Sequence, residues 1–463
     1  MHNHGAEALS IVAELLKKVL GDEWVVSDRD SIEGYIYDET PEPIRPKAAE
    51  RLVLVKPAST EEVSRVLKMA NEYRVPVFPV GGRTGLVGGC VPTKPGIVLS
   101  LERMNRIEVD RENLMAVAEA GATLGDLMKA AEGAGLFFPP RPGDEGAQIG
   151  GLIATNAGGV RAVKYGVMRN YVRGLEVVLP TGEILKLGGK LLKNNAGYDL
   201  MQLFIGSEGT LGVITKAVIR LFPRSRYMVT LIAPFNSRAD ALRAVPEILR
   251  SGVMPLAIEY VHLKDIKRAA EHIGEKWPVE EGQVQLIIVL DGMRFEEVFY
   301  ACDEVAKICE AHGALDALIV DNPKEQERVL RIRGSIYTAI KRDIWDTLDV
   351  AVPPAKLGDL MDALDEIASR YGVDLSACGH AGDGNLHVHI TRDVESSEVA
   401  EMIRRDIYAA AVKLGGTITG EHGVGKVRAK SLDLVLSEKH VEMMRKIKRV
   451  FDPNGILNPV EYL

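Results

Sequence analysis

Glycine is concentrated in five segments of this 463-residue chain, and these segments constrain the fold more than any other feature. The chain has 45 glycines, and they cluster at residues 81–89, 143–159, 206–212, 379–384 and 415–425. Glycine costs chain entropy and adds no side chain to a core, so such clusters mark tight turns or backbone that closely approaches a ligand. Five of them predict a large ligand that the backbone contacts repeatedly.

The length predicts at least two domains, because a single hydrophobic core stops growing at about 250–300 residues. Up to residue 225 the pattern indicates short strands and helices, and beyond it long amphipathic helices alternate with strands, which is typical of an antiparallel sheet covered by helices. We therefore expect an α+β fold with a ligand-binding domain at 1–225, a second domain at 226–430, and a segment at 431–463 that returns to the first.

The individual elements follow from hydrophobic periodicity and capping residues. Helices are predicted at 9–20, 59–73, 237–251, 294–312, 324–342, 355–371, 395–414 and 437–450. Strands are predicted at 51–55, 76–80, 97–101, 114–120, 174–179, 213–221, 284–290 and 386–390.

Composition excludes several classes of protein. A net charge of −8 argues against nucleic-acid binding, which needs a basic surface. No apolar run approaches the ~18 residues of a transmembrane helix, and the first residues lack the basic segment of a signal peptide. Four cysteines without a C-x-x-C motif indicate a reducing compartment and no iron–sulfur cluster. We expect a cytoplasmic protein, with peripheral membrane association left open.

The first glycine segment follows a predicted strand, and its backbone N–H groups could form an anion-binding nest for a pyrophosphate. Two common nucleotide motifs are excluded. Gly81–Gly89 does not contain G-x-G-x-x-G and no helix opens from it. Gly420–Lys426 imitates a P-loop, but Val427 stands where the motif needs Ser or Thr.

Three glycine motifs in the same order resemble a known family. They read P-V-G-G-R-T-G-L-V-G-G from Pro79, I-G-G-L-I-A-T-N-A-G-G from Ile149, and G-S-E-G-T-L-G-V-I-T from Gly206. The chain is similar to the vanillyl-alcohol-oxidase/p-cresol-methylhydroxylase flavoproteins, within them to the D-lactate and glycolate dehydrogenase branch. The resemblance covers nearly the whole chain, and it implies a two-part FAD-binding domain of the p-cresol-methylhydroxylase type followed by a cap domain.

The resemblance also implies which loops hold the FAD. In the family the first loop holds the pyrophosphate, the second passes the ribityl chain and flavin ring, and the third contacts the adenosine. Covalent members carry a histidine where this chain has Thr84, so non-covalent FAD is expected. The implied cofactor residues are Pro79, Val80, Gly81, Gly82, Arg83, Thr84, Gly85, Leu86, Gly88, Gly89, Pro142, Gly143, Gly150, Gly151, Ala154, Thr155, Asn156, Gly158, Gly159, Glu208, Gly212, Val213, Ile214 and Asn458.

A predicted histidine-rich hairpin contains the second group of candidate functional residues. The segment from Cys378 to His389 reads C-G-H-A-G-D-G-N-L-H-V-H, and Asp-Gly between extended residues is a strong two-residue turn signal. If Asp383-Gly384 form the turn, His380 lies directly across from His387, and His389 projects from the same face. A lone histidine is usually a structural residue, but three of ten on one hairpin face favour a metal or catalytic site.

Two histidines and a carboxylate would form a three-ligand site with an open position, as in catalytic zinc sites. Glu421, in the segment G-E-H-G-V-G, is the candidate carboxylate. The resemblance implies His380, His387 and Glu421 as metal ligands and His422 as a base beside the flavin. It does not decide whether His389 is a fourth metal ligand or a substrate contact. The expected ion is divalent, with zinc favoured and manganese or iron as alternatives.

A carboxylate substrate also needs a cation. Arg331 and Arg333 are candidates, since a guanidinium binds a carboxylate through two donors, and the resemblance favours Arg333. The 2-hydroxyglutarate-oxidising branch carries a lysine just before its D-V-x-x-P, where this chain reads D-T-L-D-V at residues 346–350. The missing cation favours a monocarboxylate, with D-lactate as the leading candidate.

The predicted activity is therefore FAD-dependent oxidation of a small D-2-hydroxy acid to the 2-oxo acid. Glycolate, D-2-hydroxyglutarate and the redox-neutral chemistry of alkyl-glycerone-phosphate synthases are alternatives within the fold. A zinc hydrolase and a non-catalytic flavoprotein subunit are alternatives outside it. The electron acceptor, whether a quinone, a cytochrome, an electron-transfer flavoprotein or an iron–sulfur subunit, is left open, as is a homodimer.

Overall fold

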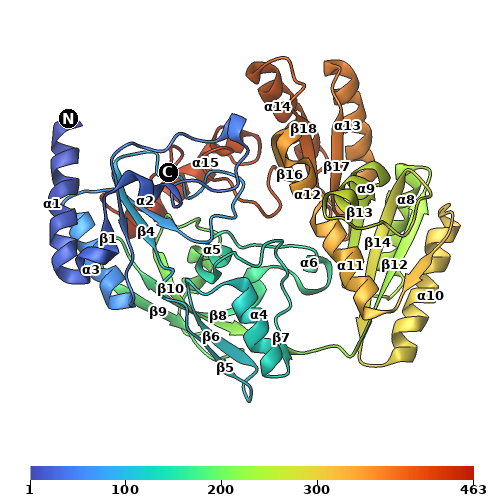
Figure 1. Cartoon of the computed structure of the whole chain (residues 1–463), viewed down its shortest axis with the longest axis horizontal. Helices are drawn as coiled ribbons and strands as arrows, with labels where there is room; N and C mark the ends of the chain where they lie inside the picture. Colours follow the sequence, from blue (N-terminus) through green and yellow to red (C-terminus); the bar gives the residue numbers. More distant parts are fainter. Residues whose placement is uncertain (1) are drawn as a thin grey trace.

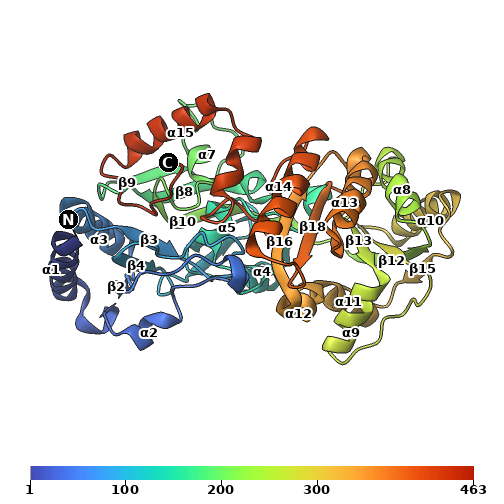
Figure 2. The same cartoon turned by 90° about the horizontal axis from the view of Figure 1, so that it is seen from above.

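A computed structural model describes residues 2–463, and Met1, the first residue of the predicted N-terminal domain, lies outside them. The chain forms two bodies that lie side by side (Figure 1). The N-terminal half forms the body that carries the N-terminus, and the yellow and orange segments form the second. The C-terminal helix crosses back to the first body (Figure 2).

The first domain contains two main sheets and a short two-stranded one. The four-stranded sheet has the order β1-β2-β4-β3, and the five-stranded sheet has the order β5-β6-β10-β8-β9 with antiparallel neighbours throughout. The pair β11-β7 lies where the chain leaves this domain. The strands are β1 (Val25–Val26), β2 (Leu52–Val55), β3 (Val77–Val80), β4 (Gly96–Ser100), β5 (Ile107–Asp110), β6 (Met115–Glu119), β7 (Leu136–Phe137), β8 (Val172–Val178), β9 (Ile184–Gly188), β10 (Val213–Arg220) and β11 (Phe222–Pro223).

Helices of this domain begin where capping residues stand. The side chain of Ser59 accepts a hydrogen bond from the N–H of Glu62, and Val63, Val66 and Leu67 then bury one face of α3 in the core. The helices are α1 (His2–Leu20), α2 (Arg29–Glu33), α3 (Thr60–Glu72), α4 (Leu124–Gly133), α5 (Ile149–Ala154), α6 (Ala162–Tyr165) and α7 (Met201–Phe204).

The second domain, which we call the cap, is built on one seven-stranded antiparallel sheet with the order β15-β12-β14-β13-β17-β18-β16. The predicted α+β class and the helix-covered antiparallel sheet are thus confirmed. The strands are β12 (Tyr227–Phe235), β13 (Ala257–His262), β14 (Val284–Gly292), β15 (Leu318–Val320), β16 (Ile344–Ala351), β17 (Leu375–His380) and β18 (Asn385–Thr391).

Helices pack on both faces of the cap sheet. Side chains of α8 (Arg238–Arg250), α10 (Phe295–Ala311), α13 (Leu357–Tyr371) and α14 (Ser397–Lys413) share one core with one face of the sheet. Side chains of α9 (Leu263–His272), α11 (Pro323–Gly334) and α12 (Ile336–Ile340) cover part of the other face. The helix predicted at 324–342 is therefore two helices, separated at Ser335.

The C-terminal segment completes the first domain. After α15 (Glu438–Phe451), Ile456 and Leu457 are buried in the core of the first domain, and Leu457 forms a bridge with Val77. The buried ammonium of Lys448 donates to the carbonyl oxygens of Thr210 and Leu457 and pairs with Asp452. The two ends of the chain are thus joined in one core, with the cap inserted between them.

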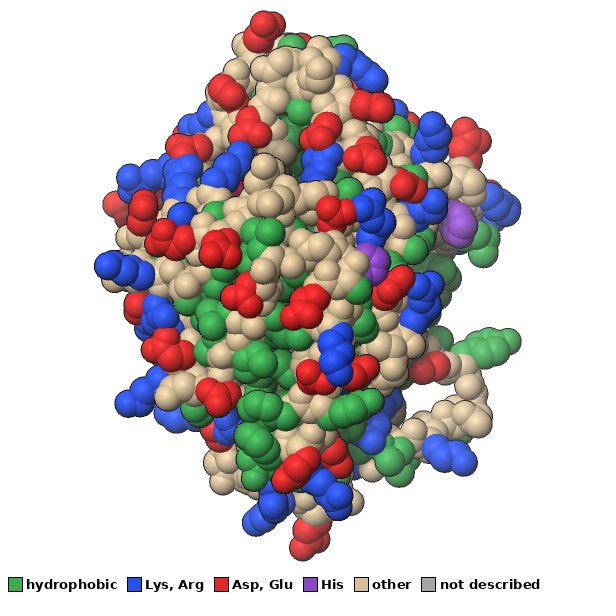
Figure 3. All heavy atoms as spheres, turned by 90° about the vertical axis from the view of Figure 1, so that its right-hand side faces the viewer, with side chains coloured by type: hydrophobic (Ala, Val, Ile, Leu, Met, Phe, Trp, Pro, Cys, Tyr) green, Lys and Arg blue, Asp and Glu red, His purple; other side chains and the backbone are tan. Residues whose placement is uncertain are grey.

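The far end of the cap exposes hydrophobic side chains between charged ones (Figure 3). Among the exposed residues of this domain are Phe295 and Tyr300 on α10 and Leu318 and Ile319 on the edge strand β15. Within residues 2–463 no helix is long and apolar enough to cross a membrane.

Candidate active site

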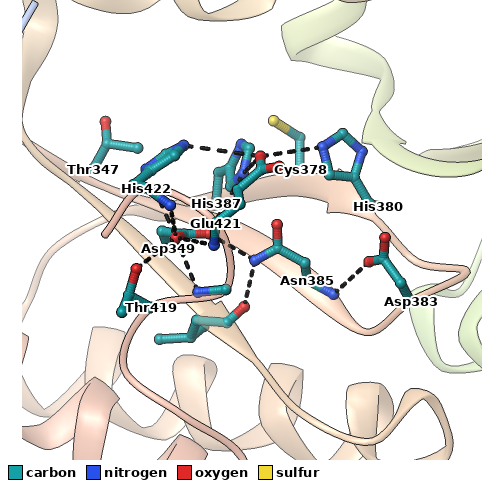
Figure 4. A network of polar contacts seen from close by, with 12 residues as sticks. Thr347, Asp349, Cys378, His380, Asp383, Asn385, His387, Thr419, Glu421 and His422 are labelled. Atoms are coloured by element: carbon teal, nitrogen blue, oxygen red, sulfur yellow. Dashed lines mark hydrogen bonds and ion pairs between the residues drawn. The ribbon is translucent and has the colours of Figure 1, made fainter. Parts of the chain in front are cut away.

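The histidine hairpin is formed by β17 and β18, in the half of the cap sheet next to the first domain (Figures 1 and 4). In β18, Leu386, Val388 and Ile390 are buried in the core beneath α13 and α14. Because successive strand residues point to opposite faces, His387 and His389 project from the other face, toward the first domain. The alternation of apolar and polar residues therefore determines which face carries the histidines.

The predicted register of this hairpin is wrong by two residues. His380 pairs with Asn385, and His387 pairs with Cys378, because the turn spans the four residues 381–384 and not Asp383-Gly384 alone. A shift of two residues keeps every side chain on its predicted face, whereas a shift of one would reverse it. His380 and His387 are diagonal neighbours, and their ring centroids lie 5.4 Å apart.

Glu421 lies between the two histidines (Figure 4). Its Oε1 is 3.5 Å from Nε2 of His380 and 3.3 Å from Nε2 of His387. Burial disfavours the charged carboxylate, but the close contacts with His380 and His387 and their positive charges outweigh this effect and hold the pKa of Glu421 well below its usual value. The three predicted metal ligands therefore converge, with the carboxylate ionised.

Asp349 holds the loop that carries Glu421, and sequence reasoning missed this role. Its Oδ2 accepts hydrogen bonds from the Thr419 hydroxyl and from the backbone N–H groups of residues 420–422, at 2.7–3.0 Å. Its Oδ1 accepts from Asn385 at 2.7 Å. The signal was an acidic residue between the apolar Leu348 and Val350 of a strand, which must find partners when it is buried.

The donor atoms suit a divalent cation. One potential ligand atom each from Asp349, His387, Glu421 and His422 lies within 4.8 Å of the other three. Nε2 of His387 is buried and has no hydrogen-bond partner among the described residues. Imidazole nitrogens with carboxylate oxygens are the ligand set of zinc, manganese and non-haem iron. The predicted ligand His380 is not in this group of four, whereas His422, predicted as a base, is. Asp349 already accepts five hydrogen bonds, so we interpret it as a support and not as a ligand.

The two other predicted histidines lie in the same wall, His389 buried and His422 half-buried. Burial lowers the pKa of His389 to about 3, and its ring contacts the Thr347 hydroxyl at 3.2 Å and the Cys378 sulfur at 3.8 Å. Burial also lowers the pKa of His422, although the charge of Asp349 opposes the shift. Nδ1 of His422 has no hydrogen-bond partner among the described residues. Both shifts favour the neutral form of the imidazole.

The structure separates the two candidate arginines. Arg331 is mostly exposed and pairs with Glu275, although it lines the same cavity as the histidines. Arg333 is almost buried, and its Nη2 lies 2.6 Å from Oε2 of Glu259, a residue that sequence reasoning also missed. Oε1 of the same Glu259 carboxylate lies 2.6 Å from Nδ1 of His380.

One cavity of about 1860 Å³ runs from the first domain to this wall. It exceeds the ~300–1,000 Å³ of a typical small-ligand site, so it has room for a large cofactor together with a substrate. Arg333, His380, His387, His389, Glu421 and His422 all line it. So do the predicted cofactor residues, with the exceptions of Gly88 and Asn156.

The two exceptions shape the backbone of the loops. Both have positive φ angles, +68° for Gly88 and +52° for Asn156. The N–H of Gly88 donates to Thr40, and the Asn156 side chain accepts from the N–H of Arg169. They support the glycine loops without facing the cavity.

At Gly151 the cavity wall leaves room for a ligand to approach the backbone closely. A Cβ atom added at Gly151 would meet no protein atom within 4 Å, and this residue lines the cavity. At the neighbouring Gly150 an added Cβ would come within 2.8 Å of the Ala120 side chain. Gly150 therefore serves packing, whereas Gly151 leaves space on the cavity side, as the second glycine loop of an FAD site requires.

Glu208 and Asn458 connect the glycine loops with the loop that carries His422. The carboxylate of Glu208 accepts the N–H groups of Val424 at 2.8 Å and Gly425 at 2.7 Å. Asn458 donates to the carbonyl oxygens of Glu208 and Gly89. Both line the cavity, but their polar side-chain groups are engaged in holding protein segments together.

The glycine-lined cavity and its cap define a flavoprotein, and comparison with known proteins gives the same class. The FAD binding domain matches residues 52–188, and the C-terminal domain of FAD-linked oxidases matches residues 224–462. The chain belongs to the family of FAD-linked oxidases and is an FAD-dependent oxidoreductase. The predicted resemblance is confirmed.

Its relatives bear out this assignment over nearly the full length. A D-lactate dehydrogenase of Archaeoglobus fulgidus is 47% identical over 92% of this chain and 95% of its own. The glycolate oxidase subunit GlcD of Bacillus subtilis is 38% identical over 92% and 91%. Among solved structures, p-cresol methylhydroxylase with bound substrate superposes with a TM-score of 0.76 at 18% identity, covering 98% of this chain and 96% of its own. The predicted fold type is thereby confirmed.

Proposed function

We propose that this protein oxidises a small D-2-hydroxy acid, with D-lactate as the preferred substrate, to the corresponding 2-oxo acid. The observation that carries the proposal is the convergence of His380, His387 and Glu421 on one wall of the cavity that the glycine loops line. The names of the relatives, D-lactate dehydrogenase and glycolate oxidase, agree with this substrate class.

Two groups would supply the chemistry that side chains lack. FAD bound non-covalently along the three glycine loops would supply the acceptor for the hydride from C2 of the substrate. His380, His387 and Glu421 would hold a divalent cation, for which zinc is our first candidate, and such a cation would make the substrate hydroxyl more acidic, just as zinc lowers the pKa of bound water from ~15.7 to ~7.

The remaining tasks fall to side chains of this chain. Arg333 binds the substrate carboxylate through the donors that Glu259 leaves free. His422, held neutral by burial, takes the hydroxyl proton as general base. His389, whose pKa is about 3, stays neutral and contacts the substrate as a hydrogen-bonding group.

The surroundings of Thr347 favour a monocarboxylate. Thr347 lines the cavity, and its hydroxyl contacts His389. The preceding Asp346 is fully buried and paired with Arg404 and Arg428. No side chain of residues 346–350 offers a cation to a second substrate carboxylate. D-2-hydroxyglutarate is therefore the weaker alternative, while glycolate, which lacks only the methyl group of lactate, remains the nearer one.

The test is anaerobic addition of D-lactate, L-lactate, glycolate or D-2-hydroxyglutarate to the purified holoenzyme while the flavin absorbance is followed. We expect D-lactate to bleach the flavin fastest and L-lactate to leave it oxidised. Prior dialysis against a chelator should reduce the rate at least 100-fold, and added Zn²⁺ or Mn²⁺ should restore it. Undiminished bleaching in metal-free protein would contradict the metal role, and bleaching by none of the four acids would contradict the substrate class.

A further inference from the structure

Glu259 is a buried carboxylate whose position calls for an explanation. It lies in the middle of β13, is 1% exposed, and stands between Ile258 and Tyr260, which point to the opposite face and join the apolar core there. A buried charge is strongly unfavourable unless partners compensate it. The charges of its partners do so: burial opposes ionisation, but His380 and Arg333 together hold the pKa of Glu259 below its usual value.

The register of the sheet places Glu259 beside His380. β13 pairs with β17 so that Glu259 and His380 are direct cross-strand partners. Oε1 of the carboxylate is 2.6 Å from Nδ1 of the imidazole. A carboxylate can only accept, so Nδ1 carries a hydrogen. Burial opposes the charged imidazole, but Glu259 and Glu421 raise the pKa of His380 well above its usual value, and a metal ion that displaces the second proton would bind the lone pair on Nε2. That atom faces Glu421 at 3.5 Å.

The other carboxylate oxygen holds Arg333. Nη2 of the guanidinium is 2.6 Å from Oε2 of Glu259. This contact is an ion pair and not an aligned hydrogen bond, because Nη2 of Arg333 and Oε2 of Glu259 have no hydrogen-bond partner among the described residues. Nε of Arg333 is also buried without one, so donors of the guanidinium remain available to an incoming anion. Glu259 thus contacts both a predicted metal ligand and the predicted substrate cation, one with each oxygen.

We propose that Glu259 is a positioning residue that sets the separation between the metal and the substrate carboxylate. It selects the tautomer and ring orientation in which Nε2 of His380 can bind the metal, and it holds the guanidinium of Arg333 at a fixed place beside that ring. The inference rests on the proposed function. Carboxylates that accept from the second nitrogen of a metal-binding histidine commonly change metal affinity about 10–100-fold when removed.

Two substitutions separate the two contacts. In Glu259→Gln the amide oxygen can still accept from Nδ1 of His380, but the amide NH₂ faces Arg333 and cannot pair with it. In the double variant Glu259→Met with Arg333→Met both charges are removed, so no unpaired charge stays buried, and His380 alone loses its partner. The matched control is Asp265→Asn, a buried carboxylate of the same domain that contacts no histidine in the hydrogen bonds and ion pairs of residues 2–463.

The readouts are Zn²⁺ affinity of the metal-stripped flavoprotein, measured by competition with a chromogenic chelator, and the steady-state constants for D-lactate. We expect Glu259→Gln to keep Zn²⁺ affinity within about threefold of wild type and to raise KM for D-lactate about tenfold or more. The double variant should bind Zn²⁺ about 10–100-fold more weakly. Asp265→Asn should change neither quantity.

Wild-type Zn²⁺ affinity in the double variant, or a wild-type KM in Glu259→Gln, would overturn the positioning role while leaving the proposed function intact. If the wild-type protein itself binds no Zn²⁺ and its flavin is not reduced by D-lactate, the proposed function fails and this inference fails with it.

Discussion

At the scale of single residues, buried charges organise the site. Glu259 and Asp349 lie in strands whose neighbours are apolar, and each divides its two oxygens between different segments of the cap. Asp349 in particular holds three consecutive backbone N–H groups, so the direction of the Glu421 and His422 side chains depends on a residue of another element. Both acidic residues can therefore act by positioning other groups of the site, without contacting the substrate themselves.

The lowered pKa of a histidine outside the site, His262, leads us to expect that acid lowers the stability of the protein. Burial lowers the pKa of His262 to about 4, and its ring contacts the Tyr260 hydroxyl at 3.2 Å. Unfolding restores a pKa near ~6.5, so between about pH 6.5 and 4 the unfolded state binds a proton that the folded state does not bind. The free energy of unfolding therefore decreases as the pH is lowered through this range. Below about pH 4 both states are protonated and the contribution is constant.

We therefore expect His262→Gln to lose less stability on acidification than wild type does. The difference between pH 7 and pH 4.5 should be smaller by roughly 2 kcal/mol, since one unit of pKa difference corresponds to about 1.4 kcal/mol. Urea unfolding of both proteins at the two pH values measures it. His440, exposed on α15, provides the matched control as His440→Gln, and an equal effect there would contradict the prediction.

From the sequence alone, the face on which the site histidines lie could be predicted, but the residues that they pair with could not. The alternation of Leu386, His387 and Val388 was enough to place the histidines on one face, because side-chain direction depends only on strand parity. The register was wrong because the four-residue turn gave no signal distinct from Asp-Gly. Glu259 could not be connected with His380 from sequence, since the two are 121 positions apart and meet only through the pairing of β13 with β17.

At the scale of elements, most long helices and buried strands lie within a few residues of their predicted ends. The helix expected at 324–342 divides because Gly334 and Ser335 interrupt it: Ser335 is the C-cap of α11, and its φ and ψ of −91° and 1° change the direction of the chain before α12. The short helix α5 was not predicted, because two of its six residues are glycines with low helix propensity. Its tertiary packing overrides that preference.

α5 provides the prediction at this scale. Leucine at position 151 would extend into the cavity, since an added Cβ meets no protein atom within 4 Å. We expect Gly151→Leu to be purified with less than about a tenth of the wild-type FAD content. Its apoprotein should melt no lower than wild-type apoprotein, because leucine favours helix over glycine by up to about 1 kcal/mol.

The flavin-to-protein absorbance ratio and the melting temperature of the apoprotein measure the two expectations. Gly358→Leu is the control, because Gly358 lies near the start of helix α13 and also has no protein atom within 4 Å of an added Cβ, yet it does not line the cavity. Normal FAD content in Gly151→Leu would show that the cofactor does not lie against this face of α5.

At the scale of the whole molecule, the site exists only where two domains meet. The cap supplies the histidines, the first domain supplies the glycine loops, and the segment after His422 passes back between them. Lys341 of the cap pairs with Glu39, and Lys164 of the first domain pairs with Asp291 of the cap at 2.5 Å. Sequence could predict both halves from their motifs, but the contacts between them depend on the tertiary arrangement.

Glu208 is the residue through which this arrangement can be tested. Its two oxygens hold the N–H groups of Val424 and Gly425, two and three residues after His422, and the backbone of Lys426 then donates to Val87 in the first glycine loop. Glutamine offers one acceptor and presents an N–H donor to the second N–H group. Losing a hydrogen bond to a charged group costs about 1.5–3 kcal/mol.

We expect Glu208→Gln to retain its FAD and to reduce it about tenfold more slowly, because a tenfold change in rate corresponds to only ~1.4 kcal/mol and a small displacement of His422 suffices. Anaerobic stopped-flow reduction by D-lactate gives the rate, and the flavin-to-protein ratio gives the FAD content. Ser207→Ala, whose hydroxyl donates within its own turn to Phe204, should change neither. If Glu208→Gln instead loses FAD and the reconstituted enzyme reacts at the wild-type rate, Glu208 serves the cofactor directly and the connection between the domains lies elsewhere.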